Sequence, residues 1–146
     1  MSTTDKRYQV FVCSTHEDLA EARQSLVQGL LAMGILPVGL ETLGPDGYQQ
    51  WNQAQKLINE SDYVVLLLGG RYGELSPIGL GYGHREFVHA TTKRKPVIAL
   101  LHDHPEVLPA SQRESTREGE GRFRDYRRLV QDKSLSRMWA EPREVG

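Results

Sequence analysis

A carboxylate and a pair of hydroxyls stand out as side chains that could do chemistry. Glu86 follows a glycine-rich segment and directly precedes Phe87, an apolar residue that we expect to enter a core. Ser14 and Thr15 end the apolar run YQVFVC near the N-terminus. A carboxylate beside a sugar carbon stabilises the positive charge that develops when a glycosidic bond breaks. These residue types favour glycosidic-bond chemistry, and a solvated acid attracted by a helix dipole is the alternative role of Glu86.

The glycine-rich segment 69–82 is a candidate ligand loop. Gly70, Arg71 and Tyr72 combine flexible backbone with a guanidinium and a phenol, which suits a ligand that has phosphates and a flat ring. Its spacing matches neither GxxxxGK[ST] nor GxGxxG, so a Walker loop and a dinucleotide fingerprint are excluded. The alternative is a turn that only reverses the chain.

The histidines do not have the spacing of a metal site. His84 and His89 are five residues apart, so they do not share a helix face. His102 and His104 lie in a predicted loop with no further ligand at zinc-site spacing. We therefore predict no metal.

Ser14 does not have the pattern of a catalytic serine, because the GxSxG motif is missing. Ser14 with Glu17, and Thr15 with Asp18, instead have the spacing of a capping box, which predicts a helix directly after the first strand. Cys13, the single cysteine, is interpreted as a buried packing thiol.

The elements that position these side chains alternate between strands and helices. The run YVVLLL at 63–68 is typical of a parallel strand buried on both faces. Strands are predicted at 8–13, 35–40, 63–68 and 97–101. The helices between them have apolar or site residues at Leu19, Ala22, Leu26, Leu30 and Met33 up to Gly34, then at Trp51, Ala54, Leu57 and Ile58, then at Glu86, Phe87, Ala90 and Thr91.

After residue 102 the composition changes. Arginine and glutamate interleave over 113–128, which predicts a mobile loop and then a solvated helix built around Phe123, Tyr126 and Val130. Residues 135–140 are predicted as an edge strand anchored by Trp139. We expect one α/β domain over 1–146, with core repeats at 7–101, clipped from the N-terminal part of a longer protein.

The predicted architecture is a three-layer, flavodoxin-like parallel sheet in the order 2-1-3-4-5, with helices on both faces. Ligands of such sheets bind beyond the carboxyl ends of the strands, where the strand order reverses. Topology brings three segments there: Ser14 with Thr15, Glu41 after the second strand, and the loop 69–82, which ends at Tyr82 and leads to Glu86.

Composition limits the partners. The chain has 146 residues, a net charge of −1 and no apolar run long enough for a membrane span. With one cysteine, it reads as a cytoplasmic protein that binds neither nucleic acid nor membrane.

Three stretches resemble a known family. YQVFVCSTHEDL resembles the first box of TIR domains, SDYVVLLLGGRYGE their central strand and following loop, and HREFVHATTKRKPVIALL the segment that holds the TIR glutamate. The chain is most similar to a TIR-like family described as a domain of unknown function, found at the N-terminus of NACHT, NTPase or repeat proteins.

This resemblance implies a TIR-like or nucleoside deoxyribosyltransferase-like fold, whose enzymatic members split the N-glycosidic bond of NAD or of nucleosides. Glu86 would be the catalytic carboxylate, Ser14, Arg71 and Tyr72 would line the nucleotide pocket, and no cofactor beyond the substrate would be required. It further implies a defence-type effector switched on when an attached sensor oligomerises, with self-association of like domains.

The chain departs from the TIR pattern next to the glutamate. Gly81 and Gly83 stand where hydroxyl residues are expected, His84 where an acid is expected, and Cys13 where serine is usual. These departures leave two alternatives open: a non-catalytic interaction module, and a domain that senses nucleotides without cleaving them.

Overall fold

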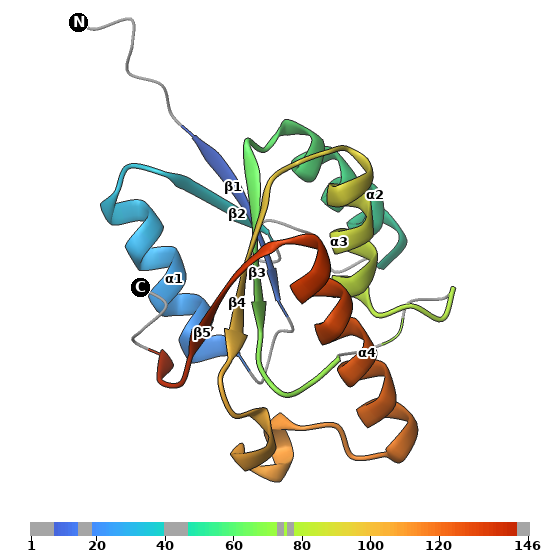
Figure 1. The fold of residues 1–146 in the computed structure, drawn as a ribbon. Helices are drawn as coiled ribbons and strands as arrows, with labels where there is room; N and C mark the ends of the chain where they lie inside the picture. The colour runs from blue at the N-terminus through green and yellow to red at the C-terminus, as the bar shows by residue number, and fades with distance from the viewer. Residues whose placement is uncertain (1–7, 15–18, 40–46, 73–74, 76–77, 143–146) are drawn as a thin grey trace, which may run out of the picture.

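Five strands form one parallel sheet. The computed structural model describes residues 8–14, 19–39, 47–72, 75 and 78–142, with backbone alone at 47–50. The strand order is β2-β1-β3-β4-β5, and every neighbouring pair runs parallel (Figure 1). The strands are β1 (Gln9–Ser14), β2 (Leu36–Gly39), β3 (Tyr63–Leu68), β4 (Val97–His102) and β5 (Leu135–Trp139). The predicted α/β class and the order 2-1-3-4-5 are confirmed.

Helices lie on both faces of the sheet. Helix α1 (Ala20–Ala32) covers one face, and α2 (Gly47–Glu60), α3 (Tyr82–Thr92) and α4 (Arg117–Lys133) cover the other (Figure 1). Side chains alternate along a strand, so β1 supplies both cores. Its Phe11 and Cys13 join the core under α2, α3 and α4, whereas its Val10 and Val12 join the core under α1.

Strand β3 lies at the centre of the sheet, where it is covered on both faces. Each residue from Val64 to Leu68 has at most 5% of its surface exposed. An apolar side chain is stabilised on either face here, which is why the strand shows no polar alternation. The prediction from YVVLLL, including its place beside β1, is confirmed.

Helix α1 differs from its prediction at both ends. No side chain caps its start, because Ser14 is the last residue of β1, so the predicted capping role of Ser14 is wrong; Thr15 and Asp18 lie outside the described residues. The chain leaves the helix through Gly34, whose φ of +75° favours glycine. Met33 was predicted on the apolar face, but it is the C-cap residue and is 68% exposed.

The charged C-terminal part forms a loop, a helix and an edge strand. Two single-turn 3₁₀ helices, Pro105–Val107 and Ala110–Gln112, lead to α4. Thr116 caps α4 by accepting a hydrogen bond from the backbone N–H of Gly119 at 2.9 Å, and Tyr126 and Val130 are buried. Strand β5 forms the edge of the sheet, with Trp139 6% exposed. Within the described ranges, no helix has both the length and the apolar character needed to cross a membrane.

Candidate functional site

The carboxyl end of β1 is the point where the strand order reverses. β1 pairs with β2 on one side and with β3 on the other, and parallel sheets typically bind ligands beyond the strand ends at such a point. The last two residues of β1 point to opposite faces, Cys13 toward the core under α3 and α4 and Ser14 toward α1. Side chains from three helices meet at this strand end.

A buried arginine from α1 lies against the end of β1. Arg23 is 3% exposed, and its Nη1 donates to Ser14 Oγ at 2.7 Å and to the carbonyl oxygen of Val12 at 3.3 Å. Burying a guanidinium is costly unless it is hydrogen-bonded. These bonds hold a positive charge beside the end of β1.

Gly39, the last residue of β2, leaves the space that this guanidinium needs. A Cβ at Gly39 would lie 2.5 Å from Arg23 Nη2 and 2.7 Å from the carbonyl oxygen of Val12. Real Cβ atoms do not approach other atoms that closely, so glycine at this position is required by the packing of Arg23.

Glu86, in the second turn of α3, is half-buried next to the end of β1. The thiol of Cys13 donates a hydrogen bond to the carbonyl oxygen of Gly83, 3.4 Å from Sγ, and lies close enough to the Glu86 carboxylate to affect its pKa. The next residue, Phe87, enters the core as predicted. Strand β1 and helix α3, distant in sequence, thus bring a thiol and a carboxylate together.

The surroundings of Glu86 change its pKa. Burial raises the pKa of Glu86 from 4.5 to about 7, while the hydrogen bond from Cys13 and the positive charge of Arg23 act in the opposite direction. Burial also raises the pKa of the Cys13 thiol well above its usual value, and the nearby Glu86 adds to this effect. Cys13 is therefore a neutral hydrogen-bond donor, and Glu86 is poised to exchange a proton near neutral pH.

The phenol of Tyr126, in α4, lies near Cys13 and Glu86. Its hydroxyl is buried and has no hydrogen-bond partner among the described residues. A Cβ at Gly83 would lie 3.6 Å from Cys13 Sγ and 3.8 Å from this hydroxyl, so the start of α3 lies between the two side chains. Burial raises the pKa of Tyr126 well above its usual value, and Cys13 and Glu86 add to this effect. The phenol stays neutral and can donate one hydrogen bond.

An aromatic cluster supports Tyr126. Its ring lies 4.7 Å from the ring of His84 and 5.5 Å from that of Tyr72. The Tyr72 hydroxyl accepts from the backbone N–H of Gly81 at 2.9 Å and lies 2.7 Å from His84 Nδ1. The Tyr72 hydroxyl can give its hydrogen to Nδ1 when the His84 ring carries its own hydrogen on Nε2. Burial lowers the pKa of His84, which fits a neutral imidazole that accepts this bond.

The remaining predicted site residues lie in several places. Gly70 forms a bridge with Arg113, Arg71 Nε lies 4.0 Å from a carboxylate oxygen of Glu114, and Tyr82 is half-buried at the start of α3. Tyr72 belongs to the buried aromatic cluster. Thr15 and Glu41 lie outside the described residues. A ligand-binding role for Gly70, Arg71, Tyr72 and Tyr82 stays a prediction.

Three side chains of the candidate site were not predicted as such from the sequence: Arg23, Tyr126 and His84. Arg23 had a visible signal, because it lies four residues after Leu19 and three before Leu26, on the apolar face of α1. A charged residue on such a face is buried only with hydrogen-bond partners. Tyr126 was recognised as a core residue, but nothing in its spacing indicated that its hydroxyl meets α3.

In the part of the chain that the structure describes, no group of three or more histidine, cysteine, aspartate or glutamate side chains is arranged to hold a metal ion. The site consists of organic side chains: a carboxylic acid, a thiol, a phenol, a hydroxyl and a guanidinium.

Comparison with known proteins supports the fold. The chain is similar to the structure of the CMP N-glycosidase BcmB of Clostridium botulinum, with a TM-score of 0.54 and 18% identity over 93% of this chain and 90% of that chain. It is also similar to the TIR domains in the activated Roq1 resistosome that directly recognises the pathogen effector XopQ, with a TM-score of 0.59 and 18% identity over 88% of this chain and 86% of that chain. At this identity the likeness shows the fold alone, which is TIR-like.

No protein of curated function matches the chain by sequence. A protein-family model matches nearly the whole chain. Residues 9–146 match the family described as a domain of unknown function, DUF4062, and the chain belongs to that family.

Proposed function

We propose that this domain hydrolyses the N-glycosidic bond of a nucleotide, with NAD as the first candidate substrate and Glu86 as the catalytic carboxylate. One observation supports this above all: Glu86 lies half-buried at the strand-order reversal, and its surroundings raise its pKa to about 7. The likeness to a CMP N-glycosidase also supports the proposal, because that protein has a similar fold.

In the proposed reaction the bond between the ribose carbon and the base nitrogen breaks, and its electron pair leaves with the base. The carbon becomes positively charged, and ionised Glu86 stabilises it. The oxygen of a water molecule then bonds to the carbon, and the proton of that water passes to Glu86 and on to solvent. In NAD the base nitrogen is already cationic, so the departing base needs no proton.

Neighbouring groups have distinct proposed roles. Arg23 keeps a positive charge near the crevice, which favours the ionised form of Glu86 and attracts an anionic nucleotide. The Tyr126 hydroxyl has no partner among the described residues and is free to donate to a ribose or base oxygen. Cys13 lies beside the Glu86 carboxylate and favours its ionised form.

The decisive experiment is a turnover assay with NAD and with CMP, using the domain both alone and clustered by a fused oligomeric tag. We expect release of the base by the wild type, loss of release in Glu86→Gln, and full activity in Glu60→Gln, an exposed carboxylate at the end of α2. Activity that appears only after clustering would support an effector switched on by an oligomerising sensor. If neither state releases base from either substrate, or if Glu86→Gln matches the wild type, the hydrolase proposal fails.

The pH profile tests the role of Glu86 separately. If the ionised carboxylate is the active form, kcat/KM rises with pH and levels off above about 7, the pKa of Glu86. A profile that is flat from pH 5 to 8 would contradict this role.

A second candidate function is self-association without catalysis, supported by an exposed apolar cluster at the sheet edge. Tyr8, Leu31, Met33 and Leu36 are each 43–68% exposed, and they lie around the start of edge strand β2, where the N–H of Leu36 bonds to the carbonyl oxygen of Tyr8 at 2.8 Å. Large exposed apolar side chains gathered at an edge are typical of contact surfaces.

Sedimentation of the wild type and of Met33→Glu distinguishes this function. We expect concentration-dependent association that Met33→Glu weakens and Glu86→Gln leaves unchanged. A monomer at all concentrations would contradict it.

A further inference from the structure

The carboxylate of Glu114 lies against loop 69–72, which follows β3. Its Oε2 accepts a hydrogen bond from the backbone N–H of Tyr72 at 2.8 Å and lies 4.0 Å from Arg71 Nε. The side chain of Glu114 is 15% exposed and that of Arg71 is 37% exposed, so solvent reaches both charged groups. A backbone N–H beside a guanidinium suits a phosphate as well as a carboxylate. The loop thus has an anion site, and a side chain of the same chain fills it.

Two glycines allow the close packing around this anion site. A Cβ at Gly119, in the first turn of α4, would overlap Glu114 Oε1, so the start of α4 forms a second wall of the site. A Cβ at Gly70 would lie 2.6 Å from the carbonyl oxygen of Gln112, and Gly70 forms a bridge with Arg113. The backbone of the β4–α4 connection is therefore held on loop 69–72 by contacts that do not involve the Glu114 side chain. That side chain can change rotamer while the two segments stay together.

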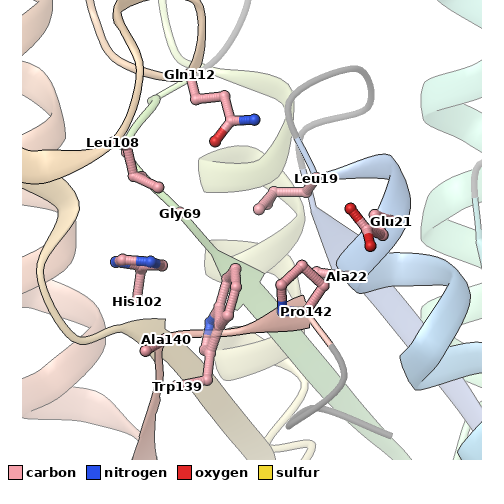
Figure 2. Close-up of a pocket in the computed structure, with 11 residues that line it drawn as sticks. Leu19, Glu21, Ala22, Gly69, His102, Leu108, Gln112, Trp139, Ala140 and Pro142 are labelled. Carbon is pink, nitrogen blue, oxygen red and sulfur yellow. The ribbon is translucent and has the colours of Figure 1, made fainter.

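The same connection limits the space on the other side of the loop. Leu108 and Gln112 line a pocket of about 100 Å³ together with Gly69 and the start of α1 (Figure 2). This volume is below the range of small-molecule sites, so a nucleoside does not fit there. The side of the loop where Arg71 and Tyr72 hold a carboxylate is the better candidate for contact with a ligand.

Tyr72 connects the anion site with α3, the helix that carries Glu86. Its backbone N–H donates to Glu114, whereas its hydroxyl accepts from the backbone N–H of Gly81 at 2.9 Å and lies 2.7 Å from His84 Nδ1. The anion site therefore lies on one side of Tyr72, and the start of α3 lies on the other. This arrangement places the anion site next to the helix whose carboxylate is proposed to act on the ribose.

We propose that Glu114 competes with the phosphate group of a nucleotide for this anion site. Its carboxylate takes the site until a nucleotide binds. A phosphate oxygen then accepts from the N–H of Tyr72, Arg71 pairs with the phosphate, and Glu114 turns to solvent. Only the identity of the ligand as a nucleotide rests on the proposed hydrolase function. Binding of the phosphate itself needs neither Glu86 nor turnover.

Inorganic pyrophosphate is the probe for a direct test, because it has phosphate groups and no glycosidic bond. In a nitrogen-15 correlation spectrum at constant ionic strength, the amide signal of Tyr72 should shift and saturate as pyrophosphate is added. The amide of Leu36, which bonds to Tyr8 at the β2 edge of the sheet, should stay in place. A Tyr72 amide that does not move at millimolar pyrophosphate in Glu114→Gln would overturn the proposal.

Charge-neutral variants test the competition. Glu114→Gln keeps an acceptor for Tyr72 but has no charge, so pyrophosphate should bind about tenfold more tightly than to the wild type. Glu120→Gln makes the same charge change at an exposed position in the first turn of α4 and should bind as the wild type does. Adding Arg71→Gln to Glu114→Gln should abolish the gain. Equal affinity in Glu114→Gln and the wild type, as expected of a purely structural contact, would refute the competition, as would an equal gain in Glu120→Gln.

The Glu86→Gln variant separates this proposal from the hydrolase proposal. It should bind pyrophosphate as the wild type does, whether or not the wild type releases base from a nucleotide. In the same variant, which is expected not to cleave CMP, CMP should shift the Tyr72 amide and cytidine, which lacks the phosphate, should not. An equal shift with cytidine would contradict recognition of the phosphate.

Discussion

Replacing Glu86 by glutamine should change how stability depends on pH. The folded protein keeps the proton on Glu86 up to a pKa of about 7, whereas the unfolded chain releases it near 4.5. Between these values the folded state binds more protons, so the free energy of unfolding of the wild type falls as pH rises. Below pH 4.5 Glu86 is protonated in both states, and its full contribution to the free energy of unfolding is present.

The magnitude follows from the two pKa values. A rise from 4.5 to about 7 corresponds to about 3 kcal/mol of cost for the ionised carboxylate in the folded state. Glu86 is only half-buried, and solvent screening reduces that figure to about 2 kcal/mol. Glu86→Gln keeps the size of the side chain and an acceptor for Cys13 but has no charge. Its stability relative to the wild type should therefore increase by about 2 kcal/mol between pH 4.5 and 8.

Urea unfolding of both proteins at a series of pH values measures this difference. Other titrating groups are common to both proteins, so they largely cancel in the comparison. A difference that stays constant from pH 4.5 to 8 would refute the reasoning, as would one that changes in the opposite direction. Either result would mean that the carboxylate is as well solvated in the folded state as in the unfolded chain.

Three further substitutions test the groups around Glu86. Arg23→Met leaves Ser14 Oγ and a β1 carbonyl without their donor and should lower the free energy of unfolding by about 3 kcal/mol, measured in urea. The same change removes the charge that holds the pKa of Glu86 down, so a carboxyl-carbon NMR titration should place that pKa higher than in the wild type; an unchanged value would contradict the contact. Gly39→Ala should lower the free energy of unfolding by about 2 kcal/mol, because the added Cβ would clash with Arg23. A thermal unfolding midpoint equal to that of the wild type would show that the guanidinium lies elsewhere. Tyr126→Phe removes a buried hydroxyl with no described partner, so its unfolding free energy should stay within about 1 kcal/mol of the wild type, while NAD or CMP turnover falls; a large loss of stability would reveal a hydrogen bond to that hydroxyl.

Much of the fold was predictable because its signals are local. The unbroken run of β3 indicated a strand covered on both faces, and the alternation of strands with amphipathic helices restricted the sheet to one simple order. Ser14 and Glu86 could be placed at one edge because parallel strands end there together. Met33 could not be placed, because helical spacing does not tell where the last turn ends.

The chemistry of the site depended on contacts that spacing does not encode. The sequence by itself determined that an acid near the start of α3 and a hydroxyl at the end of β1 lie at the same edge of a parallel sheet. Only the tertiary structure decided that the thiol of Cys13 meets Glu86 and that Arg23 is buried against Ser14. The physical reason is that hydrophobic periodicity reports which face of an element is buried. A pKa or a hydrogen bond is set by distances of a few ångströms between side chains from different elements.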